Sequence, residues 1–271
     1  MQFHAALEPI LRIADPSEKI AAFRNFHAAY RNGETVFEQE FVPAVFEQPS
    51  YAGICEIVAP QDVPRRKKNA SPEGQALLLH AIAHIEYSAI DLAIDHAYRF
   101  AGMPEAFYDD WLEVAEDECR HFEMLNALLE ELGSSYGAFP VHSALFEAAE
   151  RTPELLERMA VVPRYFEANG LDATPQILQR LTQIRGNDMN DKIVAALNVI
   201  LVEEVDHVRK GDRWFVYACE KEGVGKEVYF DIIEGFYPAG YPRQKYLNVE
   251  ARKEAGFSCS ELNRISSEHI C

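Results

Sequence analysis

The sequence predicts an all-α protein built around an antiparallel helical bundle. Alternating apolar and polar runs of period two, the pattern of half-buried strands, are almost absent from the 271 residues. Long segments of helix-forming composition instead begin at capping residues or prolines and end at glycines. The connections between these segments are short, which favours antiparallel packing of neighbouring helices.

The first part of the chain, residues 1–73, is expected to form an N-terminal extension of helical and irregular structure. A short helix is predicted over residues 3–13 and a second over residues 16–33, where proline stands in the first turn. Over residues 34–69 the helical pattern weakens and prolines recur. The basic run at residues 65–68 is interpreted as a solvated linker rather than a nucleic-acid patch.

Residues 74–223 are predicted to form the four-helix bundle. Its long helices are expected at residues 72–100, 104–133, 152–170 and 189–222, with a further short helix at 174–186. Pro163 lies inside the third helix, where its missing N–H and its ring should kink or break the helix. Residues 224–271 are expected to add a short helical segment and a tail that packs on the bundle.

Composition disfavours several classes of partner. The chain has 26 Lys and Arg against 44 Asp and Glu, a formal net charge of -18. This balance argues against a general nucleic-acid surface, and an anionic membrane would repel it. We see neither a signal peptide nor a run of about 18 apolar residues, so no membrane partner is expected.

The cysteines point to a reducing compartment. They show no C-x-x-C pairing, their number is odd, and a chain of this size does not need disulfides to fold. Reduced thiols in a cytoplasmic protein are therefore expected at all five positions, Cys55, Cys119, Cys219, Cys259 and Cys271.

Two Glu-x-x-His motifs carry the chemistry, Glu118 with His121 and Glu204 with His207. The spacing puts the two side chains of each motif on one face of a helix, one turn apart. Each motif lies in the middle of a long helix among apolar residues, so its carboxylate and imidazole should be buried. Burial of such groups without compensation costs several kcal/mol, and a metal ion would provide that compensation.

Two other helices each carry a single suitable carboxylate, Glu86 and Glu167. The order along the chain is therefore Glu, Glu-x-x-His, Glu, Glu-x-x-His, which is the ligand set of ferritin-like di-iron and di-manganese bundles. Carboxylates can bridge two ions, and four of them neutralise two divalent ions. We expect two metal ions, iron before manganese, held by Glu86, Glu118, His121, Glu167, Glu204 and His207.

Charged neighbours of these ligands are candidates for orienting them. A metal-bound histidine usually donates its other N–H to a carboxylate. Asp117 is therefore predicted to hold His207, and Glu203 to hold His121, with Arg120 balancing the acidic cluster. The alternative is that these side chains face solvent.

Other polar side chains near the ligands are less specific. His80 and His84 are spaced i, i+4, but His84 is two positions from Glu86 and so points to roughly the opposite face. We interpret both as structural residues or as neighbours of the site, and their contribution to it stays open. Tyr87 and Tyr165 lie close to proposed ligands and are interpreted as core residues rather than redox tyrosines.

Six segments carry a family resemblance: "SPEGQALLLHAIAHIEYSAIDLAIDHAYRF", "DDWLEVAEDECRHFEMLNALL", "YGAFPVHSALFEAA", "VVPRYFEANGLDATP", "VEEVDHVRKGDRWFVYAC" and "YLNVEARKEAGFS". In these segments, over roughly residues 60–260, the chain resembles the DUF455 family of ferritin-like proteins. The resemblance implies a ferritin-like bundle with a dinuclear metal site, and all six ligands carry over without departure. It implies no substrate, because a fold alone does not fix a function.

The predicted function is that of a metal-dependent oxidoreductase. The expected enzyme is a di-iron hydroxylase or oxygenase that activates O2 and acts on an unidentified small substrate. No flavin or iron–sulfur motif is visible, so electrons would come from a partner protein. The alternatives are iron handling, peroxide detoxification, or a non-catalytic bundle stabilised by metal. The long extensions fit a storage shell poorly, which favours a monomer or dimer.

Overall fold

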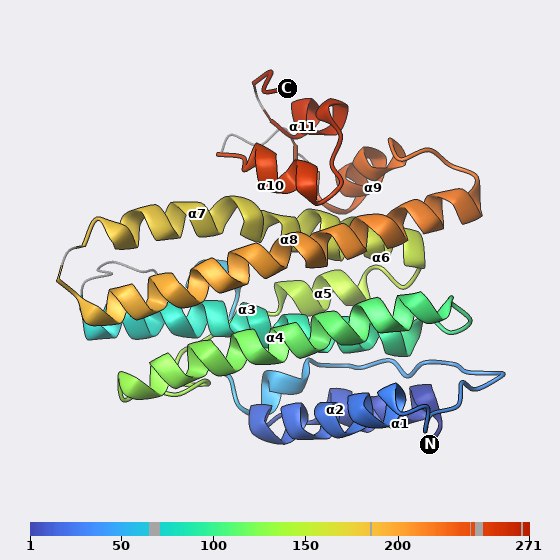
Figure 1. Cartoon of the computed structure of the whole chain (residues 1–271), viewed down its shortest axis with the longest axis horizontal. Helices are drawn as coiled ribbons and strands as arrows, with labels where there is room; N and C mark the ends of the chain where they lie inside the picture. The colour runs from blue at the N-terminus through green and yellow to red at the C-terminus, as the bar shows by residue number, and fades with distance from the viewer. Residues whose placement is uncertain (65–70, 185, 239, 242–245, 267) are drawn as a thin grey trace. The chain divides into compact units, whose positions relative to one another are not determined.

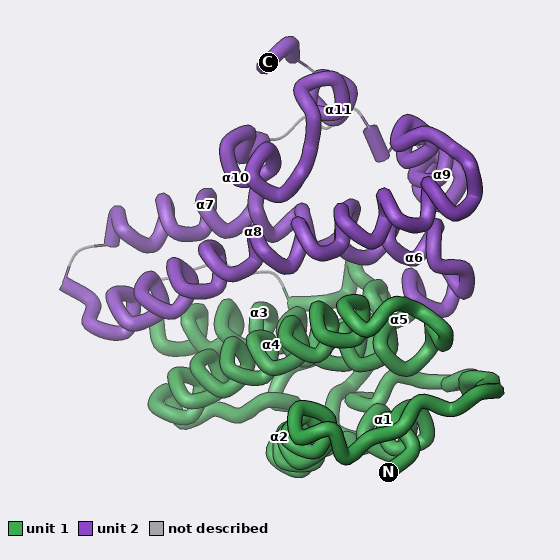
Figure 2. The backbone as a smooth tube through the Cα atoms, turned by 45° about the vertical axis from the view of Figure 1, so that its right-hand side comes forward, with its two compact units in different colours: residues 1–146 green, residues 147–271 purple. Residues whose placement is uncertain are grey.

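The computed structural model describes residues 1–64, 71–184, 186–238, 240–241, 246–266 and 268–271. The predicted basic linker at 65–68 lies outside them. Within the described ranges the chain is helical, and β-type pairings such as that of Gln2 with Val36 are isolated bridges. The all-α prediction is therefore confirmed. Two compact units make up the chain, residues 1–146 and residues 147–271 (Figure 2).

The first unit contains four principal helices (Figure 1). They are α1 Phe3–Arg12, α2 Pro16–Arg31, α3 Pro72–Arg99 and α4 Glu105–Glu131, with short 3-10 turns at Ser50–Gly53 and Pro60–Asp62. A further helix, α5 Ala144–Glu150, spans the sequence boundary between the units. The predicted bounds of α1 to α4 agree with the structure to within about two residues.

Local capping explains where the long helices begin. The Ser71 side chain accepts a hydrogen bond from the Gly74 N–H at 3.2 Å, and Pro72 occupies the first turn of α3. The same arrangement starts α2, where the Asp15 carboxylate accepts from the Glu18 N–H. Both helix starts follow from residues within one turn, which is why the sequence alone predicts them.

The N-terminal helices are fastened to α3 and α4 by polar side chains. The Tyr87 hydroxyl on α3 donates to the carbonyl of Ala14 at 2.9 Å, so this tyrosine is a structural residue. The buried ammonium of Lys19 on α2 donates to Asp91 on α3. The Ser50 hydroxyl also donates to Asp91, at 2.6 Å. The extension is thus part of the packed first unit.

One helix among the described residues, α3, is long and apolar enough to cross a membrane by length and composition. Its most apolar window has a mean hydropathy of 1.4, and 78% of that window is buried inside the protein. A mostly buried helix of this kind is typical of a protein core.

The second unit is built on the longest helix, α8 (Figure 1). Its elements are α6 Leu155–Val161, a π-helical segment Val162–Glu167, α7 Ala168–Thr182, α8 Asp188–Glu222, α9 Val228–Phe236, α10 Val249–Glu254 and α11 Cys259–Ile265. The predicted bounds of the last long helix are confirmed, and Gly223 ends it with a left-handed φ of 70°.

The predicted end of the third helix near residue 170 and the restart at 174–175 are wrong. Helix α7 runs through both Gly170 and Pro175. Pro175 cannot donate to the carbonyl of Leu171, four residues earlier. The side-chain amide of Asn248 donates to that carbonyl instead, at 3.2 Å. A side chain 77 positions from Leu171 in the sequence therefore replaces the missing backbone donor, and the helix continues.

The prediction of five reduced thiols is also wrong. Cys259, at the start of α11, forms a disulfide with Cys271. The two residues are 12 positions apart, and their Cα atoms are separated by 5.3 Å. An odd number of cysteines does not prevent a pair that the fold brings together. Cys55, Cys119 and Cys219 are free and buried.

Candidate metal centre

The first unit brings together three of the predicted ligands. Helix α3 carries Glu86, and α4 carries Glu118 and His121 one turn apart. The Nδ1 atom of His121 lies 3.2 Å from Oε2 of Glu86 and 3.4 Å from Oε2 of Glu118. All three residues are buried, and one ligand atom from each lies within 4.8 Å of the other two. We call these three residues the first half-site.

The electrostatics of the first half-site favour a positive charge between its carboxylates. Burial, and after it the neighbouring Glu118 carboxylate, raise the pKa of Glu86 to about 8. Burial alone would lower the pKa of His121, but its hydrogen bonds with Glu118 and Glu86 raise it to about 11. A divalent cation placed among these three side chains would supply the positive charge that a proton supplies without it.

In the second unit, α8 carries the other motif. The Nδ1 atom of His207 lies 3.3 Å from Oε2 of Glu204. Glu167, the other ligand predicted in this unit, is the last residue of the π-helical segment. One turn later, a Cβ placed on Gly170 would lie 3.8 Å from Cγ of Glu204, so α7 packs against α8 at the level of this carboxylate. We call Glu167, Glu204 and His207 the second half-site.

The π-helical segment has an identifiable cause. Pro163 lies at its start and lacks a backbone N–H, so the regular α-helical hydrogen bonding is interrupted there. The predicted kink or break at this proline is thus confirmed as a π-helical turn. Such turns are frequent at functional sites. Opposite the proline, α8 has Gly211, where an added Cβ would lie 2.2 Å from Cβ of Pro163. The absence of a side chain at Gly211 lets the two helices approach.

The residue types of both half-sites suit divalent transition metals. Each half-site combines two carboxylates with one imidazole, and in each motif Nδ1 faces the carboxylate one turn earlier. Mixed carboxylate and imidazole ligation suits iron and manganese. The geometry of the first half-site therefore meets the requirement for a buried metal ligand set.

The predicted orienting residues have partly different surroundings. Arg120 donates a hydrogen bond to Asp117, one turn earlier on α4. Glu203 is half-buried on α8. The predicted contacts of Asp117 with His207 and of Glu203 with His121 stay predictions.

The histidines His80 and His84 hold the loop that follows α4. Nε2 of His84 lies 2.9 Å from the carbonyl of His142, so this nitrogen carries the proton, and Nδ1 accepts from the Tyr136 hydroxyl at 2.9 Å. Nε2 of His80 accepts from the Gly137 N–H at 2.9 Å. Burial lowers the pKa of each imidazole to about 4. These contacts favour the structural interpretation.

Two polar residues of interest were missed by sequence reasoning. Tyr136 stands in a loop with no spacing pattern that marks it. Arg164 follows Pro163 and precedes Glu167 by three positions, and it is fully buried. A basic residue in an apolar segment beside a proposed ligand is a signal that could have indicated a buried acidic partner.

Comparison with known proteins agrees with the resemblance in the sequence. The family model described as "Protein of unknown function (DUF455)" matches residues 12–263. A protein of Haemophilus influenzae described as "Uncharacterized protein" is 36% identical over 276 residues, which cover 97% of this chain and 93% of that protein. No solved structure matches the chain. Because the matched range covers most of the sequence and includes both half-sites, the chain belongs to the DUF455 family.

Proposed function

We propose that this protein is a metal-dependent oxidoreductase in which the two half-sites together bind two iron ions. The observation that carries the proposal is the buried group of Glu86, Glu118 and His121, whose donor atoms converge within 4.8 Å. The second half-site repeats the same residue types in the same order along the chain. The repeat supports a ferritin-like four-helix bundle with one ligand-bearing helix for each Glu and each Glu-x-x-His motif.

The side chains of the chain have three tasks in this proposal. The carboxylates neutralise the charge of the ions, and burial excludes bulk water from them. His121 must release its Nδ1 proton before that nitrogen can serve as a ligand. A bound iron pair would supply the electrons that reduce O2 and the oxidising power that acts on a small organic substrate. We further propose a separate electron-donor protein as the source of reducing equivalents.

Metal quantification after anaerobic purification tests the proposal. We expect about two iron ions per wild-type chain and consumption of O2 when the Fe(II) protein meets air. Glu118→Gln should lose iron, because a neutral amide replaces a charged ligand. Glu130→Gln is the matched control, since Glu130 is an exposed residue of the same helix. On α8, Glu204→Gln and the exposed Glu220→Gln form the equivalent pair.

The outcomes separate the alternatives. Retention of many iron ions per chain in a large shell would favour iron storage over an oxidoreductase. Binding of metal without O2 consumption would favour a metal-stabilised bundle. Magnetic coupling between the two ions, measured by electron paramagnetic resonance, is expected if the half-sites form one dinuclear centre. Failure of the wild-type protein to bind any divalent metal would refute the proposal.

A further inference from the structure

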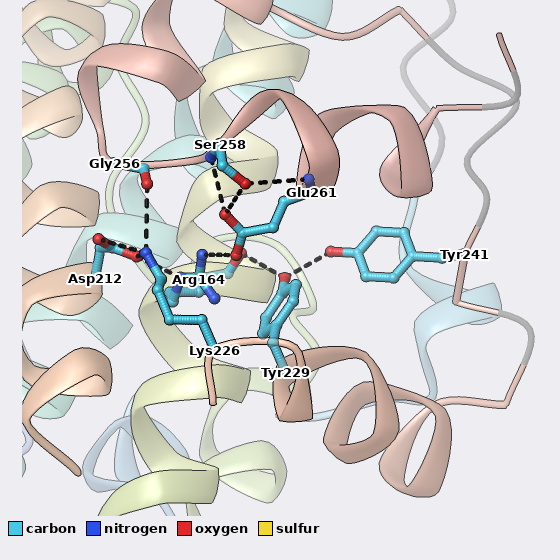
Figure 3. A network of polar contacts seen from close by, with 8 residues as sticks. All are labelled: Arg164, Asp212, Lys226, Tyr229, Tyr241, Gly256, Ser258 and Glu261. Atoms are coloured by element: carbon cyan, nitrogen blue, oxygen red, sulfur yellow. Dashed lines mark hydrogen bonds and ion pairs between the residues drawn. The ribbon is translucent and has the colours of Figure 1, made fainter. Parts of the chain in front are cut away.

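A buried ion-pair network surrounds the π-helical segment of the second unit. Arg164 is fully buried, and its Nε lies 2.9 Å from Oδ1 of Asp212 on α8. Its Nη2 donates to Oε1 of Glu261 on α11 at 2.6 Å. Figure 3 shows both carboxylates directed at the guanidinium. The side chain thus connects the π-helical segment to the long helix and to the C-terminal region at once.

The partners of Arg164 are themselves fixed. The Ser258 hydroxyl and N–H both donate to Oε2 of Glu261, at 2.8 Å each, and Lys226 donates to Asp212 at 3.0 Å (Figure 3). Burial would raise the pKa of Glu261, but the Arg164 charge and hydrogen bond hold it below its usual range. Because each carboxylate accepts from further donors, Asp212 and Glu261 are held in defined positions on either side of the buried guanidinium.

Aromatic rings from α8, from α9 and from the connection between α10 and α11 enclose the same guanidinium. Its central carbon lies 4.4 Å from the ring centre of Tyr229, 4.6 Å from that of Phe257 and 4.7 Å from that of Phe215. At these distances each ring attracts the cation, and the attraction is strongest where water is excluded. The rings therefore exclude water from the ion pairs and limit the movement of Arg164.

Side chains of the C-terminal elements also hold the backbone on both sides of Glu167. The Tyr229 hydroxyl donates to the carbonyl of Arg164 at 3.0 Å. On the other side, Nη2 of Arg252 donates to the carbonyl of Ala168 at 2.9 Å. Arg252 is fully buried and pairs with Asp172 on α7, one turn after Ala168. Two side-chain donors therefore fix carbonyls three residues before Glu167 and one residue after it.

We propose that α9 and α10, through Tyr229 and Arg252, act as a clamp that positions Glu167 for metal binding. The inference rests on the proposed function, because it takes Glu167 as a ligand. Pro163 interrupts the regular α-helical hydrogen bonding at the start of this segment, so the direction of the side chain at its end depends more on other contacts. The clamp supplies those contacts. Tyr229 and Arg252 are positioning residues, since they act through the backbone beside Glu167.

Cobalt(II) titration of the full-length protein tests the clamp, because the absorption of bound cobalt reports its ligand geometry. Tyr229→Phe removes the hydroxyl that holds the Arg164 carbonyl, and we expect about tenfold weaker binding of one of two cobalt ions with a changed spectrum. Tyr108→Phe is the matched control. The buried Tyr108 hydroxyl also donates to a carbonyl at 3.0 Å, that of Phe100 in the first unit. Its removal should leave cobalt binding unchanged.

A second variant and a second measurement keep the test decisive if one variant fails to fold. Arg252→Lys keeps the charge but loses the planar donor set, and it should weaken cobalt binding in the same way. Amide hydrogen exchange over residues 164–170 should be faster in Tyr229→Phe and unchanged in Tyr108→Phe. If Arg252→Lys does not fold, Tyr229→Phe decides the question.

The results distinguish the clamp from the metal site itself. If wild-type protein binds no cobalt, the proposed function is refuted and the clamp with it. If wild-type protein binds cobalt while Tyr229→Phe loses only as much thermal stability as Tyr108→Phe, with unchanged cobalt affinity and spectrum, the metal site stands and the clamp is refuted.

Discussion

The close approach of Pro163 and Gly211 leads to a specific prediction for Gly211→Ala. An added Cβ would lie 2.2 Å from Cβ and 2.6 Å from Cγ of Pro163. Carbon atoms in contact prefer about 3.5–4.0 Å, so the two backbones would have to separate by more than about 1 Å. Neither group can rotate away, because one is attached to the backbone and the other is a closed ring.

The expected magnitude follows from two opposing terms. In an unobstructed helix interior, replacing glycine by alanine stabilises by about 0.5–1 kcal/mol. Overpacking a close contact costs about 1–3 kcal/mol, and the geometry here places the cost at the upper end. We therefore expect Gly211→Ala to lower the free energy of unfolding by about 2 kcal/mol. It should also weaken metal binding, because Glu167 lies one turn after Pro163.

Urea denaturation followed by circular dichroism measures the difference. Gly235→Ala in α9 is the control, since an added Cβ there meets nothing within 4 Å. Gly170→Ala is intermediate, because its Cβ would make an ordinary 3.8 Å contact with Glu204. If Gly211→Ala were as stable as Gly235→Ala, the close approach would not restrict this position and the reasoning would be wrong.

Three further predictions concern other parts of the molecule. The pKa of buried His80 is lowered to about 4, so the unfolded chain binds more protons below pH 6.5 and the free energy of unfolding decreases as the pH falls from 6.5 to 4. Urea denaturation at pH 7 and pH 4.5 should show that this decrease is smaller by about 2–3 kcal/mol in His80→Gln than in the wild-type protein. An equal decrease in both proteins would contradict the prediction. Lys19→Met leaves Asp91 without its buried cation and should lower the free energy of unfolding by about 3 kcal/mol. The double variant Lys19→Met with Asp91→Asn should recover part of this loss. If urea denaturation shows that the effects of the two substitutions simply add, the two residues are not a coupled pair. Removal of metal by a chelator should lower the melting temperature, since a ligand at 100 times its Kd stabilises the folded state by about 2.7 kcal/mol. Calorimetry with and without the chelator measures the shift. Unfolding transitions at the same temperature would contradict the prediction.

Sequence reasoning succeeded where the determinants are local. The starts of α2 and α3 depend on capping groups within one turn, and the spacing of Glu118 and His121 fixes their common face. The first half-site required one further step, the pairing of two helices joined by a short connection. Such pairing is the default for consecutive helices, so Glu86 could be assigned from its place in an apolar helix.

The failures have distant determinants. Pro175 was expected to start a helix, but Asn248 supplies the missing donor and α7 continues. The bond between Cys259 and Cys271 depends on a spatial approach that composition does not reveal. The burial of Arg164 likewise depends on Glu261, 97 positions later. A single sequence gives no means of pairing these residues before the fold is known.

The compact arrangement of the first half-site has a consequence for how the protein assembles during synthesis. Its three residues lie in one helical hairpin, α3 and α4, whose connection is only five residues long. The entropy lost on closing such a short connection is small, and helical hairpins form early because their contacts are local. A nascent chain that has emerged as far as Glu131 already contains every donor of this half-site. These three side chains can therefore come together before α8 has been translated.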